Sequence, residues 1–226
     1  NRKTDFKISD FIRSMIYAQV LNPGSKLSAF ENVIPNIYGA RTFSYDQILD
    51  EIEYIGSDYQ KYIECFNHGI ELNWHRNTKK AFFDCTNYYF EIDLEDDLRR
   101  KGPSKENRKS PIIGQALMLD AEQVPIAMER YPGNESEKPY LRKTVEDRKS
   151  RYDISSKIIE VADKGLNCAK NIYYLHKEGK DGYIFSKSFK GKSLSQAEKE
   201  WIALDNDDQL WKEVKDEEGN LLYRYK

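Results

Sequence analysis

The stretch from residue 79 to 129 carries three extended patterns in succession, and few folds accommodate such a run. Residues 79–94 are rich in aromatic side chains and follow a period of two, and apolar runs follow at 112–119 and 124–129. A period of two is the signature of a β-strand, and polar segments that suit turns separate the three runs. The sequence therefore predicts three consecutive strands in an antiparallel meander.

Alternating helices and strands follow the meander. We expect a charged helix over 135–151, a short strand over 157–162, a helix over 166–177 and a fifth strand over 182–186. The resulting order is βββαβαβ. Three antiparallel strands followed by parallel strands with helical crossovers match an α/β ribonuclease H-like core with a mixed sheet. In this arrangement the first and fourth strands lie side by side at the centre of the sheet.

Two aspartates fall within these two central segments. Asp84 stands in the middle of the first strand, and Asp163 directly follows the fourth. Charged residues rarely occupy such places unless they are paired or bind a metal. Hard cations such as Mg²⁺ prefer oxygen ligands, so two carboxylates and a substrate phosphate suit a metal site for phosphodiester hydrolysis or transfer. The alternative is that residues 163–165 form an ordinary strand-to-helix turn and that Asp84 is a polar edge residue.

The regions on either side of this core differ from it. Residues 1–75 predict helices, one over 9–21 with Phe11, Ile16 and Val20 at helical spacing. A second is expected to start at Ser44 with Gln47 in a capping box, and a third to follow Ser57 with Gln60 in that role. After residue 189 the sequence predicts a helix over 195–203 and a hairpin whose strands are 211–215 and 221–225. The predicted domains are a helical region (1–75), the core (76–188) and a further β-rich segment (189–226).

The composition argues against membrane-spanning, secreted and disulfide-bonded proteins. The chain has 226 residues, no apolar run near the roughly 20 residues that cross a bilayer, and no signal-peptide core. Its three cysteines are widely separated, which suggests neither disulfides nor a zinc site and favours a cytoplasmic compartment. Because the sequence begins with Asn1 rather than Met, we expect it to belong to a longer reading frame.

The formal net charge of −2 by itself argues mildly against nucleic-acid binding. The charged residues are, however, unevenly distributed along the sequence. Residues 99–109 are strongly basic. The candidate contacts to a DNA phosphate backbone are Arg99, Arg100, Lys101, Lys105 and Arg108. The alternative is that this stretch is an exposed hairpin loop.

Several short segments, in this order and spacing, resemble bacterial insertion-sequence transposases of the DDE class, in the group named after insertion sequence four. The resemblance runs from about residue 10 to about residue 190. Its motifs are the "PGSK" turn (Leu21–Lys26), the strand of the first catalytic Asp (Phe83–Thr86), the "SKDHR" loop (Ser104–Arg108), the "G-P-…-PGN" stretch (Val124–Ile126 and Tyr131–Asn134) and the "ADRG" turn (Val161–Gly165).

The resemblance implies a metal-dependent enzyme that cleaves and joins DNA strands, with Asp84 and Asp163 as catalytic metal ligands. It implies Mg²⁺ as the cofactor, with Mn²⁺ as a substitute, and transposon ends and target DNA as partners. It further implies a bacterial protein that is associated with the nucleoid and not with a membrane. Such a protein would act as a dimer on paired DNA ends. The segment 189–226 would begin the β-rich insertion of this family.

Two departures from the family pattern concern the site. Lys164 replaces an Arg and keeps its charge, and Glu106-Asn107 replaces Asp-His. The third catalytic carboxylate, a Glu on a helix after the insertion, has no counterpart up to Lys226. We therefore expect an incomplete transposase with little or no activity alone. The rival hypotheses are an inactive DNA-binding remnant and a ribonuclease H-like nuclease that hydrolyses strands without joining them.

Overall fold

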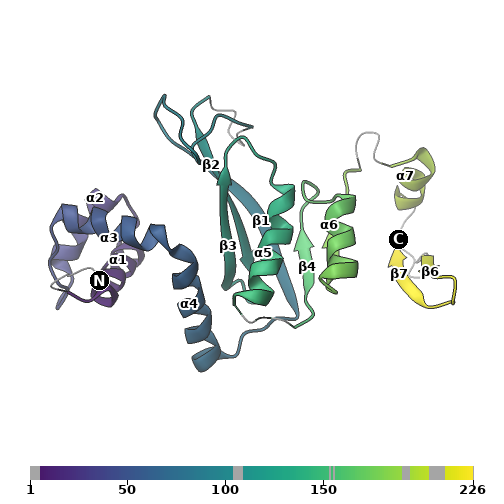
Figure 1. The fold of residues 1–226 in the computed structure, drawn as a ribbon, viewed down its shortest axis with the longest axis horizontal. Coiled ribbons are helices and arrows are strands. Elements are labelled where there is room, and N and C mark those ends of the chain that lie inside the picture. The colour runs from purple at the N-terminus through teal and green to yellow at the C-terminus, as the bar shows by residue number, and fades with distance from the viewer. Residues whose placement is uncertain are drawn as a thin grey trace. The chain divides into compact units, whose positions relative to one another are not determined.

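The structure is a computed structural model that describes residues 6–103, 109–152, 154, 156–189, 194–203 and 212–225. The chain divides into two compact units, Asn1–His75 and Arg76–Lys226. Figure 1 shows the helices of the first unit and the sheet of the second. Within the described residues, we find no helix with both the length and the apolar character that a bilayer-spanning segment requires.

The first unit is helical. Its elements are α1 (Ile8–Leu21), α2 (Lys26–Ser28), η1 (Ala29–Val33), η2 (Ile34–Asn36), α3 (Tyr45–Ser57) and α4 (Tyr59–Trp74). Phe43 lies edge-on against Phe6 and Phe11, with ring centroids 5.1 and 5.7 Å away. This aromatic cluster joins the start of the unit to the segment before α3 and forms part of its core together with Ile48.

The predicted helix starts are confirmed for α1 and α3 but not for α4. The amide of Gln47 donates to Ser44 Oγ (3.2 Å) and the Ser44 amide donates to Gln47 Oε1 (2.9 Å), so the predicted capping box is present. Ser57, in contrast, is the last residue of α3, and its hydroxyl donates to the carbonyl of Tyr54. The N-cap of α4 is therefore Asp58, without a side-chain cap.

The buried face of α1 also differs from the simplest interpretation of its sequence. Phe11, Ser14 and Ala18 are buried, whereas Ile16 and Val20 are exposed. Phe11 fixes the rotation of the helix because its ring enters the aromatic cluster. Residues three and seven positions later then face inward, and positions 16 and 20 turn outward.

The second unit is built on a five-stranded mixed sheet, so the predicted α/β class is confirmed. Its strands are β1 (Lys80–Tyr89), β2 (Ile112–Leu119), β3 (Pro125–Pro132), β4 (Ile159–Ala162) and β5 (Gly182–Phe185), and they lie in the order β3-β2-β1-β4-β5. The first three pair antiparallel, while β4 runs parallel to β1 and β5 parallel to β4. The crossovers hold α5 (Lys138–Ser150) and then α6 (Ala169–Tyr173) with η3 (Tyr174–Glu178).

Both crossover helices cover the same face of the sheet (Figure 1). Ala81, Phe83 and Cys85 of β1 are buried on that face, and Leu141 and Val145 of α5 are fully buried. The residues that alternate with them lie on the other face, which we call the open face. It carries partly or fully exposed apolar side chains, such as Ile159 and Ile184. The crossover helices of this unit therefore cover one side of the sheet.

The remaining described elements are α7 (Gln196–Ala203), β6 (Lys212–Lys215) and β7 (Leu221–Tyr225). β6 and β7 pair antiparallel, which confirms the predicted hairpin. Asp216 shapes its turn, because Asp216 Oδ1 accepts hydrogen bonds from the amides of Glu218 and Asn220.

Two glycines, one in β2 and one in the turn that follows β3, leave no room for a side chain. A Cβ atom on Gly114 would lie 2.0 Å from the ring of Tyr131, which covers that glycine. A Cβ atom on Gly133 would lie 2.2 Å from the carbonyl oxygen of Ile112. The Tyr131 ring also stacks on Tyr140 of α5, with centroids 4.2 Å apart. These contacts fix the point at which the chain leaves β3 and enters α5.

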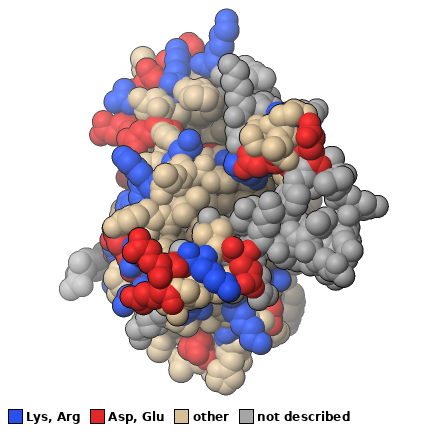
Figure 2. Space-filling model, turned by 90° about the vertical axis from the view of Figure 1, so that its right-hand side faces the viewer, with Lys and Arg blue, Asp and Glu red and all other residues tan. Residues whose placement is uncertain are grey.

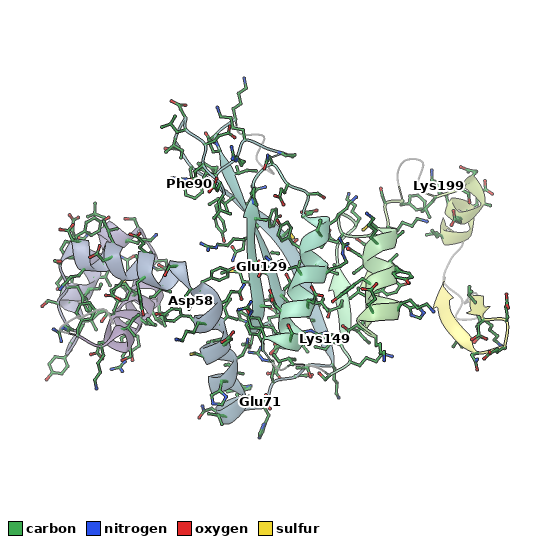
Figure 3. All side chains as sticks on the ribbon, viewed as in Figure 1. Asp58, Glu71, Phe90, Glu129, Lys149 and Lys199 are labelled. Atoms are coloured by element: carbon green, nitrogen blue, oxygen red, sulfur yellow. The ribbon has the colours of Figure 1, made fainter. Side chains whose placement is uncertain are left out.

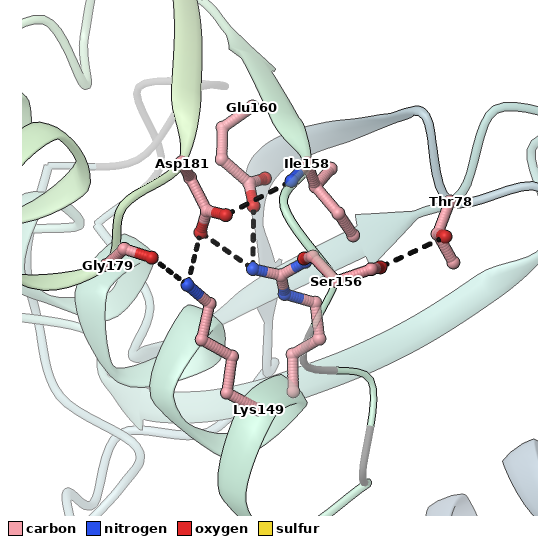
Figure 4. Close-up of polar contacts among 8 residues, drawn as sticks. Thr78, Lys149, Ser156, Ile158, Glu160, Gly179 and Asp181 are labelled. Carbon is pink, nitrogen blue, oxygen red and sulfur yellow. Dashed lines mark hydrogen bonds and ion pairs between the residues drawn. The ribbon is translucent and has the colours of Figure 1, made fainter.

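A buried cluster of charges joins α5, β4 and the link that precedes β5 (Figure 4). Arg148 Nη2 lies 2.7 Å from Asp181 Oδ2 and 3.5 Å from Glu160 Oε1, and all three side chains are inaccessible to solvent. Lys149 Nζ lies 2.9 Å from the same Asp181 oxygen. Asp181 Oδ1 accepts the amide of Ile158, the residue before β4. One aspartate thus holds the helix and the start of the strand together.

A second carboxylate on the covered face contacts α5. Glu129 of β3 is buried and lies between β3 and α5 (Figure 3), and Lys143 Nζ approaches its Oε2 to 2.8 Å. Burial raises the pKa of Glu129 above its ordinary value. The ion pair with Lys143 acts in the opposite direction, so this contact supports the packing of α5 on β3.

The burial of Glu160 predicts that the stability of this unit depends on pH. Its burial raises its pKa from 4.5 to about 7, so the folded chain holds this proton more tightly than the unfolded chain. The stabilising contribution is fully present below pH 4.5 and is lost as the pH rises to about 7. We expect the free energy of unfolding of this unit to lose roughly 3 kcal/mol over that window from this group. Glu160→Gln should remove the loss in urea titrations followed by circular dichroism.

The matched control is Glu146→Gln, which changes an exposed glutamate on the same helix as Arg148. This variant should retain the wild-type dependence on pH. An unchanged dependence in Glu160→Gln would show that Glu160 is not the titrating group.

Candidate active site

The register of β1 and β4 places the two predicted aspartates next to each other. The last pair of this parallel ladder is Phe83 with Ala162. Asp84 and Asp163 are the next residue on each strand. Because neighbouring residues of a strand point to opposite faces, and Phe83 is buried under the helices, Asp84 points to the open face. Both aspartates are exposed to solvent.

Local hydrogen bonds orient both carboxylates. Asp84 Oδ1 accepts the amide of Cys85 at 2.8 Å. Asp163 Oδ1 accepts the amide of Gly165 at 2.8 Å, and the Asp163 carbonyl accepts the amide of Leu166 at 3.3 Å. Residues 163–165 therefore form a strand-to-helix turn, as the alternative interpretation expected. The turn holds the Asp163 carboxylate at the carboxyl end of β4, beside β1.

Part of the premise for singling out these aspartates was wrong. Asp84 does not lie in a strand that is buried on both sides, because the open face of β1 is exposed. Glu160, in the strand that ends directly before Asp163, is a charged residue that is fully buried. Glu160 points to the covered face and meets Arg148, so its role in the structure is ionic packing.

The carboxylate of Glu137 lies near that of Asp163, a contact that was not predicted. A Cβ atom built on Gly165 would lie 2.5 Å from Glu137 Oε1 and 3.1 Å from Asp163 Oδ1. Glu137 is half-buried and directly precedes α5. No sequence pattern links residue 137 to the turn, because the contact depends on how α5 starts above the end of β4.

The aspartate pair has the donor chemistry of a site for a hard divalent cation. Asp84 and Asp163 offer carboxylate oxygens on adjacent strand ends, the ligand type that Mg²⁺ and Mn²⁺ accept together with water. Across the described part of the chain, no group of three His, Cys, Asp or Glu side chains is arranged to hold a metal ion. A cation held by these two carboxylates would take its remaining ligands from water or from a substrate.

Arg99 and Arg100, two of the predicted DNA-binding residues, differ in their contacts. Arg99 Nε lies 2.5 Å from Asp96 Oδ2, and the guanidinium lies 5.7 Å from the ring centroid of Phe90. Hydrogen bonds from Arg99, first from its amide, lower the pKa of Asp96. The backbone of Arg100 pairs with Ile112 in both directions.

Of the other three predicted contacts, the structure describes one. Lys101 is exposed. Lys105 and Arg108 lie outside the described residues. Figure 2 shows basic and acidic side chains interspersed on the face that it presents, which agrees with the nearly balanced formal charge.

Comparison with known proteins gives distant structural likenesses. No protein-family model matches the chain, and no curated protein matches it. Among solved structures, it is similar to a piggyBac transposase in a synaptic complex with hairpin DNA, with a TM-score of 0.49 and 12% identity over 96% of this chain and 50% of that one. It is also similar to the Mos1 transposase in a paired-end complex with the left transposon end, with a TM-score of 0.33 and 8% identity over 82% of this chain and 60% of that one.

Both similar structures are DNA transposases, but neither likeness identifies the fold or the activity of this chain, since the TM-scores are below 0.5 and the identities below 25%. The chain spans half the length of the piggyBac transposase chain and 60% of the Mos1 chain. The evidence for a function must therefore come from the geometry of the aspartate pair and its surroundings.

The crowding at Gly165 gives a test of the turn. In Gly165→Ala, the new methyl group would meet the carboxylates of Glu137 and Asp163, so the flexible Glu137 side chain must move and the Asp163 carboxylate must give way slightly. We expect a free energy of unfolding close to that of the wild type, measured by urea denaturation, because the displacement of these carboxylates offsets the entropy that alanine removes from the unfolded chain. Gly69→Ala is the control, because a Cβ atom at that helical position meets open space. It should stabilise the chain by roughly 0.5–1 kcal/mol. Equal effects of the two substitutions would contradict the proposed crowding.

Proposed function

We propose that this chain belongs to a DDE-type DNA transposase and contains two of its catalytic carboxylates, Asp84 and Asp163. The observation that carries the proposal is the register of β1 and β4, which sets the two aspartates side by side at the carboxyl end of β4. The strand arrangement supports the ribonuclease H-like type of core, because β1, β2 and β3 are antiparallel while β4 and β5 run parallel to β1. The motifs around both aspartates agree with the same family.

The chain's own residues have a limited set of tasks in this mechanism. Asp84 and Asp163 would bind Mg²⁺ or Mn²⁺, and the amides of Cys85 and Gly165 hold their carboxylates in place. A divalent cation bound in such a site would activate the attacking oxygen and stabilise the negative charge that develops at the phosphodiester. The attacking oxygen would belong to water or to a DNA 3′-hydroxyl, so no side chain needs to form a covalent bond. Exposure of both aspartates leaves them accessible to a DNA strand.

The finer parts of the proposal come from the family resemblance. They are membership of the group named after insertion sequence four, a β-rich insertion that begins near residue 189, and a Glu on a helix after that insertion as the third carboxylate. Because the third carboxylate has no counterpart in residues 1–226, we expect these residues alone to cleave DNA weakly or not at all. Pairing of two transposon ends would require a dimer on DNA.

Two alternatives make different predictions. An inactive DNA-binding remnant would bind DNA without cleaving it, and the longer reading frame would lack a helix that bears the missing Glu. A ribonuclease H-like nuclease would hydrolyse strands and would not join a 3′-hydroxyl donor to a target. Analysis of the products formed from a labelled donor strand separates joining from hydrolysis.

Metal binding tests the aspartate pair in this chain. Titration with Mn²⁺, followed by the electron paramagnetic resonance signal of the free ion, should detect a bound ion. Asp84→Asn and Asp163→Asn should each weaken the binding at least about tenfold, because each removes one of the two anionic ligands. In a polypeptide that cleaves DNA, either substitution should abolish metal-dependent cleavage with little effect on folding.

Asp93→Asn provides the control, since it changes an exposed aspartate in the loop after β1. Its Mn²⁺ affinity should equal that of the wild type. Undiminished Mn²⁺ binding in both Asp84→Asn and Asp163→Asn, or retained strand cleavage in Asp84→Asn, would reject the assignment.

A further inference from the structure

The helical unit has a hollow of its own, between α1 and the turn that follows η2. Its volume is about 360 Å³, and its lining includes Asp10, Arg13 and Tyr17 of α1 together with Tyr38 and Arg41. The lining thus combines two aromatic rings, two guanidinium groups and one carboxylate. Such a mixture is unlike a core cavity, which apolar side chains fill.

The two tyrosines are unusually exposed for large aromatic residues. Tyr38 has a relative exposure of 104%, so its ring has no cover from the chain, and Tyr17 is 49% exposed. A tight turn projects Tyr38 outward. The amide of Ala40 donates to the Ile37 carbonyl at 3.1 Å, and Gly39 adopts a positive φ of 72° that a residue with a side chain rarely accepts. The turn therefore presents a flat ring to solvent at the edge of the hollow.

The charged groups of the hollow are accessible as well. The side chain of Arg13 is 59% exposed, and its Nη2 lies 4.0 Å from Asp10 Oδ1, the outer limit of an ion pair. Exposed pairs of this kind contribute little energy, so Arg13 can exchange this partner for another anion. Arg41 is exposed and lies with its guanidinium 5.4 Å from the ring centroid of Phe6. The two guanidinium groups outnumber the single carboxylate.

We propose that this hollow is a DNA contact site, in which Arg13 and Arg41 bind backbone phosphate and Tyr38 stacks on a base or sugar. Guanidinium groups are well suited to phosphate oxygens, and aromatic rings stack on bases of any sequence. The inference rests on the proposed function, which requires DNA as a partner, and adds a binding site in the helical unit. Tyr and Arg also occur at contacts between proteins, but the exposed apolar side chains of α1, such as Val20 and Leu21, are not part of this lining.

DNA affinity of the 226-residue chain tests the site. The probes are a fluorescein-labelled 30-base-pair duplex of random sequence and a 30-nucleotide single strand, both measured by fluorescence anisotropy at several salt concentrations. Tyr38→Ala should raise the Kd for at least one probe about five- to thirtyfold through the loss of stacking. Tyr38→Phe keeps the ring and should bind like the wild type. Arg13→Ala should weaken binding and reduce the salt dependence by about one phosphate contact.

Tyr54→Ala is the matched control, because Tyr54 is 47% exposed on α3 and does not line the hollow. It should leave the Kd unchanged, and circular dichroism should show that all variants are folded. If the wild-type chain binds DNA and neither Tyr38→Ala nor Arg13→Ala changes the affinity, this inference is overturned and the proposed function is not. If Tyr38→Ala instead changed only the oligomeric state, the hollow would be a protein contact. Failure of the wild type to bind either probe would overturn both this inference and the DNA partner of the proposed function.

Discussion

The parallel pairing of β1 and β4 is the constraint on which the candidate site depends. It joins a long strand of the meander to a strand of four residues, and the two aspartates follow its last pair, Phe83 with Ala162. Since side chains alternate along a strand, a slip of one residue would send Ala162 to the open face and remove Asp163 from the level of Asp84. The site therefore requires a fixed register in a very short strand.

Charges anchor that short strand. Asp181 accepts the amide of Ile158, directly before β4, while it also contacts Arg148 and Lys149 of α5. Burial of ions is costly, and a well-packed apolar cluster of similar volume is often as stable. An ionic cluster, however, tolerates few alternative partners, because an unpaired buried charge is strongly unfavourable. We infer that the cluster contributes more to the position of β4 than to the net stability of the fold.

Local sequence patterns predicted the helices and strands well. Features that depend on contacts between residues distant in sequence were harder to predict. The apolar run of β2 and the capping box at Ser44 are local features of neighbouring residues, so both were predictable. The cap at Ser57 failed because a serine hydroxyl can equally bond a carbonyl of the preceding turn, as it does with Tyr54. The aspartate pair followed from the order of elements. Glu137 beside Gly165 and the partners of Arg148 could not be predicted, since packing of α5 decides both.

The ring of Tyr131 over Gly114 has a consequence for how this sequence can vary. The backbone of β2 at residue 114 and the aromatic ring from β3 share a space that has no room for even one methyl group. A larger residue at position 114 is compatible with the fold only if position 131 becomes smaller, and the stacking on Tyr140 is then lost. We therefore expect these two positions to covary across the β2–β3 ladder, so that substitutions there occur jointly in homologous chains.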